Sequence, residues 1–107
     1  MKGLVYRGPR DIAYESVADP AIEDDGDVIV QVRACSICGS DLHIYNGDTF
    51  SDQPGYCVGH EAVGEVVEIG RGVRQRRIGE RVMLPAAVGC GGCASCLAGN
   101  VLRCERD

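Results

Sequence analysis

Four cysteines near the end of the chain have the number and spacing of ligands for one metal ion. Cys90, Cys93 and Cys96 occur at every third position, and Cys104 follows further along. Four thiolates can close around a single ion with tetrahedral geometry, and the glycines among them let the backbone turn toward the sulfurs. A site with four protein ligands has no free position for a substrate, so we expect it to stabilise the fold. Zinc is the metal that such closed thiolate sites typically hold.

The same segment has two other interpretations. Bacterial ferredoxins also use a C-x-x-C-x-x-C run, but their fourth cysteine comes sooner and is followed by proline. In this chain Glu105 follows Cys104, although the spacing alone leaves an iron–sulfur cluster open. Residues 89–94 formally match a dinucleotide-binding fingerprint. We reject that match because cysteines crowd it and no helical pattern follows.

A second group of potential ligands lies earlier, on two separate segments. Cys38 stands in C-G-S-D-L-H, and His60 stands in G-H-E. One thiolate and one imidazole are good zinc ligands, but only the fold can bring them to the same ion. An isolated histidine such as His60 is more often structural than a ligand. Cys35 and Cys38 also form a C-x-x-C pair, which is a second possible redox or metal motif.

The elements that must position these residues are mostly short strands. Alternating or β-branched runs predict strands at residues 2–7, 12–17, 28–34, 62–69 and 80–84, separated by glycine- and proline-rich turns. Ser40 or Asp41 can cap a short helical turn that ends near Gly47. Residues 86–107 hold the cysteine cluster and predict little regular structure. Many short strands with glycine turns indicate a small β-barrel or sandwich.

Composition narrows the class of protein. The 107 residues suffice for one domain, and 25% charged with 45% hydrophobic residues is an ordinary globular balance. A net charge of -5 argues against a nucleic-acid-binding surface. The sequence has no apolar run long enough to span a membrane and no apolar signal-peptide region at its start. We therefore expect a cytoplasmic protein, in which cysteines are metal ligands or buried thiols more often than disulfides.

Taken together, these motifs resemble the zinc-dependent medium-chain alcohol dehydrogenases, and the resemblance covers nearly the whole chain. It runs from the strand before Cys38 through C-G-S-D-L-H, G-H-E, G-E-V-V-E-I-G and R-I-G-E-R-V to the four cysteines. The resemblance implies a mainly β fold, the GroES-like partly open β-barrel with short helical turns and an irregular zinc lobe at residues 89–105. It assigns the structural zinc to Cys90, Cys93, Cys96 and Cys104.

The resemblance also implies roles at the second group. Cys38 and His60 correspond to the first two ligands of the catalytic zinc, and Glu61 corresponds to a glutamate beside it that coordinates in some members. Ser40 corresponds to the hydroxyl that contacts the alcohol and begins proton removal. His43 corresponds to the far end of the proton relay in some members.

Three further residues complete the comparison. Asp41 corresponds to a carboxylate that orients a ligating histidine. Cys35 and Cys57 match no ligand position of the family, and we expect both to be buried thiols.

The resemblance implies hydride transfer between a small alcohol or polyol and NAD or NADP. Residues 1–107 would form the GroES-like N-terminal domain of an enzyme that is a homo-oligomer at full length. The sequence shows no strand–helix pattern for a nucleotide-binding domain, so we expect the chain to be a portion of that enzyme and inactive alone. Two alternatives remain at this point: a zinc-ribbon-like binding module and an iron–sulfur electron carrier.

Overall fold

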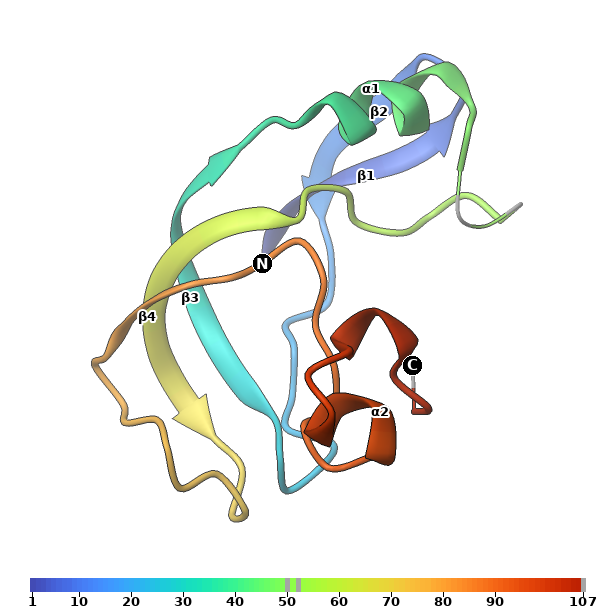
Figure 1. The fold of residues 1–107 in the computed structure, drawn as a ribbon. Coiled ribbons are helices and arrows are strands. Elements are labelled where there is room, and N and C mark those ends of the chain that lie inside the picture. Colours follow the sequence, from blue (N-terminus) through green and yellow to red (C-terminus); the bar gives the residue numbers. More distant parts are fainter. Residues whose placement is uncertain (50, 52, 107) are drawn as a thin grey trace.

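A computed structural model describes residues 1–49, 51 and 53–106. Two antiparallel sheets are its main regular structure. A hairpin joins β1 (Lys2–Gly8) to β2 (Asp11–Ser16). The second sheet has the order β3-β4-β5, from strands Val28–Ser36, Glu61–Ile69 and Arg81–Met83. Figure 1 shows β3 and β4 as a long curved ribbon pair below the hairpin. The predicted mainly β fold with open sheets is confirmed.

Helices are few and short, and they carry or adjoin the predicted ligands. Helix α1 (Gly39–Asn46) follows β3 and ends at Gly47, whose φ of 105° is in the left-handed region that glycine adopts most easily. Near the end of the chain, α2 (Ala94–Leu97) and the 3-10 turn η1 (Val101–Arg103) fold beside each other. Within the described residues no helix is long and apolar enough to cross a membrane.

The segment before β4 is held against the hairpin, and this fixes the approach to His60. The N–H of Tyr6 donates to the Tyr56 carbonyl at 3.0 Å, and the N–H of Val58 donates to the Leu4 carbonyl at 2.9 Å. The rings of Tyr6 and Tyr56 stack with centroids 5.4 Å apart. The segment therefore runs beside β1 before the chain enters β4 at Glu61.

Only a small apolar core is fully enclosed among the described residues. It consists of Val5, Tyr6, Ile44 and Val66. Ile44 comes from α1 and packs this helix toward β1. Burying each such side chain contributes about 1.5–3 kcal/mol, so other contacts must hold the more distant segments.

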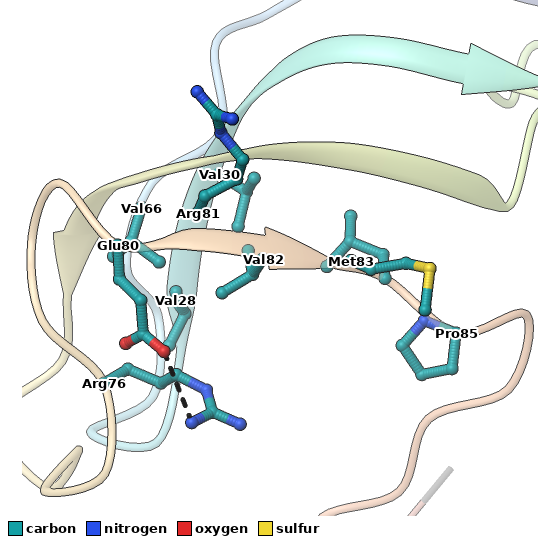
Figure 2. Close-up of a pocket in the computed structure, with 10 residues that line it drawn as sticks. Val28, Val30, Val66, Arg76, Glu80, Arg81, Val82, Met83 and Pro85 are labelled. Carbon is teal, nitrogen blue, oxygen red and sulfur yellow. Dashed lines mark ion pairs between the residues drawn. The ribbon is translucent and has the colours of Figure 1, made fainter.

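A shallow hollow of about 410 Å³ opens on the β3-β4-β5 sheet. Figure 2 shows valines from these three strands on its floor, with the Arg76–Glu80 ion pair at one end and Met83 and Pro85 at the other. Arg76 Nη1 and Glu80 Oε1 are 3.6 Å apart. None of the predicted ligands lines this hollow, so it is separate from the candidate metal chemistry.

Gly64 lies where the backbones of β3 and β4 approach closely, and it gives a first test of the fold. A Cβ atom at Gly64 would lie 2.4 Å from the Gln31 carbonyl oxygen and 2.6 Å from Val30 Cγ1. We expect Gly64→Ala to lower the free energy of unfolding by about 2 kcal/mol or more, because the backbones must separate. Urea denaturation measures this. Gly39→Ala is the control, since a Cβ there meets no atom within 4 Å; equal midpoints for the two variants would contradict the close packing.

Candidate metal centres

The four cysteines predicted to share an ion lie together in the structure. Their sulfur atoms are all within 4.8 Å of one another. Cys93 is the N-cap of α2, Cys96 lies inside that helix, and Cys104 follows η1. All seven cysteines of the chain are free thiols. Four mutually close sulfurs are the donor set that a closed tetrahedral zinc site requires.

Backbone N–H groups point at these sulfurs and favour their thiolate forms. The N–H of Cys90 donates to Cys104 Sγ at 3.3 Å, and the N–H of Cys96 donates to Cys93 Sγ at 3.4 Å. Gly89 must be a glycine for the cluster to close, because a Cβ there would lie 2.7 Å from Cys96 Sγ. The cradle therefore fits anionic sulfurs around a small cation.

Two of the thiols have strongly different acidities in the absence of a metal. Backbone N–H donation from Glu105 and Cys96 lowers the pKa of Cys93 to about 6. The N–H of Gly91 lowers the pKa of Cys96, but the hydrogen bond with the Cys93 sulfur, burial and Cys104 outweigh it and raise the pKa to about 12. At neutral pH Cys93 is thus a thiolate and Cys96 a thiol, so binding a metal must displace a proton from Cys96.

Glu105 links two segments of the cysteine lobe through hydrogen bonds to Ser95. Nothing in the sequence indicated this role. Its Oε1 accepts from the N–H of Ser95 at 3.3 Å and from the Ser95 hydroxyl at 3.1 Å. These bonds tie the first turn of α2 to the residue after Cys104. The link holds the two segments that carry the last three cysteines.

The second group of predicted ligands also comes together. One ligand atom each of Cys38, His60 and Glu61 lies within 4.8 Å of the others, and all three residues are partly buried. Cys38 is the N-cap of α1, His60 ends the segment beside the hairpin, and Glu61 begins β4. A thiolate, an imidazole and a carboxylate leave one position of a tetrahedral zinc open, as in catalytic sites.

Asp41 connects two of these three residues. Its Oδ2 accepts from the Cys38 N–H at 2.8 Å, and its Oδ1 lies 3.4 Å from His60 Nδ1. The same Oδ1 is buried and makes no hydrogen bond to any described residue. The carboxylate therefore faces the imidazole in the way that ligand-orienting carboxylates do.

Ser40 lies against the same pair of ligands. Its Oγ is 3.0 Å from His60 Nε2. Hydrogen bonds from the Ser40 side chain and backbone, then from His60, lower the pKa of Cys38. The hydrogen bond with Cys38 in turn raises the pKa of His60, although burial opposes this. Because a metal needs neutral His60, binding at this site weakens as the pH falls.

Three other residues that the sequence singled out lie apart from the cluster. His43, in the last turn of α1, is exposed, and its Nδ1 is 3.6 Å from Asp48 Oδ2. Its place in a proton relay stays a prediction. The expected burial of Cys35 and Cys57 is wrong, since both thiols are exposed. They lie at the end of β3 and on the segment beside β1, where no further layer of the described residues covers them.

Known proteins match the part of the chain that contains both clusters. Residues 24–107 match the family model described as the alcohol dehydrogenase GroES-like domain. A medium-chain reductase/dehydrogenase of an Acremonium species is 46% identical over 104 residues, which is 97% of this chain and 36% of the relative. An uncharacterised zinc-type alcohol dehydrogenase-like protein of Bacillus subtilis is 41% identical over 107 residues, which is 100% of this chain and 28% of the relative.

A solved structure agrees with the sequence relatives. The alcohol dehydrogenase of Thermus sp. ATN1 superposes with a TM-score of 0.91 and 35% identity, over 99% of this chain and 30% of that one. The expected GroES-like fold is thereby confirmed. The chain spans about a third or less of the length of these relatives.

Proposed function

Because the chain belongs to the zinc-dependent medium-chain alcohol dehydrogenase family through its GroES-like domain, we propose that it is the metal-binding catalytic part of an NAD(P)-dependent alcohol dehydrogenase. The proposed substrate is a small alcohol or polyol. One observation carries the proposal: Cys38, His60 and Glu61 form an open ligand set in the same chain as a closed four-cysteine cluster.

We assign the two clusters different tasks. Cys90, Cys93, Cys96 and Cys104 hold a structural zinc in the lobe at residues 89–105. Cys38, His60 and Glu61 hold a catalytic zinc, and the donor types and their mutual distances fit that ion. Bound there, zinc supplies Lewis-acid polarisation of an alcohol oxygen.

The chain's own residues handle the proton. The Ser40 hydroxyl lies beside two of the ligands, so it can accept the alcohol proton at Oγ while it releases its own proton outward, toward His43 and solvent. Asp41 Oδ1 lies 3.4 Å from Nδ1 of His60, where a carboxylate can orient the ring of a ligating histidine. A nicotinamide bound outside residues 1–107 would supply the hydride acceptor.

We also propose the domain assignment, cellular location and assembly state by analogy with the family. We assign residues 1–107 to one GroES-like unit of a cytoplasmic enzyme that assembles as a homo-oligomer. The names of the related proteins support dehydrogenase chemistry in general, but they do not identify a particular alcohol as the substrate. A zinc-ribbon-like module would explain the lobe alone, and an iron–sulfur carrier would make the protein brown. Neither accounts for the Cys38, His60 and Glu61 set.

A chimera tests the proposed function directly. Residues 1–107 replace the matching segment of the Thermus sp. ATN1 alcohol dehydrogenase, which has the same fold over 99% of this chain. We expect the chimera to reduce NAD or NADP when given small alcohols or polyols, followed by the absorbance of the reduced nicotinamide. A folded chimera with both metal sites filled and no turnover on any of these substrates would contradict the proposal.

A further inference from the structure

The Ser40 hydroxyl stands where His60 would meet a metal. An imidazole has two nitrogens, and each nitrogen of His60 faces a polar side chain. Nδ1 faces the Asp41 carboxylate at 3.4 Å, and Nε2 is 3.0 Å from Ser40 Oγ. A neutral histidine can bind a metal only through the nitrogen that carries no proton.

Asp41 decides which nitrogen that is. A carboxylate accepts hydrogen bonds and donates none, so Asp41 Oδ1 at 3.4 Å favours the tautomer of neutral His60 with the proton on Nδ1, although the two atoms form no hydrogen bond in the structure. In that tautomer Nε2 presents a lone pair, to which the Ser40 hydroxyl can donate. The lone pair that Ser40 uses is the one that a metal would need.

Ser40 is also tied to the second ligand atom. Its side chain and backbone lie beside the Cys38 sulfur and lower the pKa of that thiol. Cys38 and Asp41 fix the first turn of α1 through reciprocal capping bonds, so the backbone of Ser40 is held in place. Its hydroxyl can leave His60 by rotation about the Cα–Cβ bond alone, between staggered positions.

We propose that the Ser40 hydroxyl and the catalytic metal compete for Nε2 of His60, so that metal binding frees Ser40 to contact the alcohol. The inference rests on the proposed function, because it concerns the same metal site. It adds an order of events. In the metal-free chain the Ser40 hydroxyl is hydrogen-bonded to His60 Nε2, and it becomes available to the substrate only after the metal has bound.

Cobalt binding measures this competition without any turnover. Co²⁺ is titrated into the 107-residue chain with its four-cysteine lobe already filled with zinc, and the thiolate-to-cobalt absorption reports the Cys38 site. Cys38→Ser supplies the background spectrum. Ser40→Ala removes the competing hydroxyl and should bind Co²⁺ about three- to tenfold more tightly, the range expected for one neutral hydrogen bond. Ser40→Thr keeps a hydroxyl and should match the wild type.

The outcomes separate this inference from the proposed function. Tighter binding by Ser40→Ala, with Ser40→Thr unchanged, supports the competition. Equal or weaker binding by Ser40→Ala overturns the competition and leaves the metal site standing. Absence of Co²⁺ absorption in both wild type and Ser40→Ala would overturn both.

Nitrogen NMR of the wild-type chain gives a second test that needs no variant. We expect the ¹⁵N resonance of His60 Nε2 to change from a hydrogen-bonded acceptor to a metal-bound nitrogen on addition of zinc, while Nδ1 keeps its proton. Metal binding at Nδ1 would overturn the competition with Ser40.

Discussion

Replacement of Cys96 by serine is expected to remove the metal from the lobe and to unfold residues 89–105. Structural zinc sites contribute about 10–16 kcal/mol of apparent binding free energy at neutral pH. A serine hydroxyl is a poor substitute for a thiolate ligand of zinc. The four buried core residues all lie outside the lobe, and Leu97 and Leu102 are 76% and 80% exposed. With helices of only four and three residues, the lobe has little besides the metal to hold it.

Zinc content and limited proteolysis measure this effect together. The wild-type lobe should resist proteolysis with zinc and become cleavable when a chelator removes it. Cys96→Ser should be cleavable in both conditions. Cys57→Ser is the matched control, because this thiol is exposed and outside both clusters. A Cys96→Ser protein that keeps its lobe zinc and its protease resistance would refute the structural role.

The features that sequence predicts well in this chain are those set by neighbouring residues. The run V-I-V-Q-V-R-A predicts a strand, and β3 spans Val28–Ser36. The spacing of Cys90, Cys93 and Cys96 predicts a cluster because short loops limit where their sulfurs can go. Gly47 ends α1 as expected, since few other residues adopt its φ of 105°.

Contacts between distant segments are less accessible from sequence. The hydrogen bond between Ser40 and His60 joins residues on α1 and on the segment before β4, and only the packing of that segment against β1 brings them within 3.0 Å. The Glu105 link to Ser95 likewise needs α2 and η1 to be in place. Burial of Cys35 and Cys57 was predicted wrongly because composition says nothing about which face of a strand is covered.

Replacement of Cys38 by serine is expected to empty the open site while the lobe keeps its metal. The change removes the only thiolate among Cys38, His60 and Glu61. In the chimera with the Thermus sp. ATN1 enzyme, turnover should fall about 1000-fold, because a Lewis acid contributes several kcal/mol to the barrier and each 1.36 kcal/mol is a factor of ten. Metal analysis should find one zinc per chain in the variant and two in the wild type.

Cys35→Ser is the control that distinguishes a C-x-x-C motif from a metal site formed by Cys38, His60 and Glu61. Cys35 precedes Cys38 in the C-x-x-C pair, yet its sulfur is not part of the ligand group, and its thiol lies near the Ser36 carbonyl instead. If the pair acted as a redox or metal motif, the two serine variants would lose activity alike. If Cys38 acts with His60 and Glu61, Cys35→Ser should keep both zinc ions and nearly full turnover. Equal losses in the two variants would therefore reassign Cys38 and remove the main support for an alcohol dehydrogenase site in this chain.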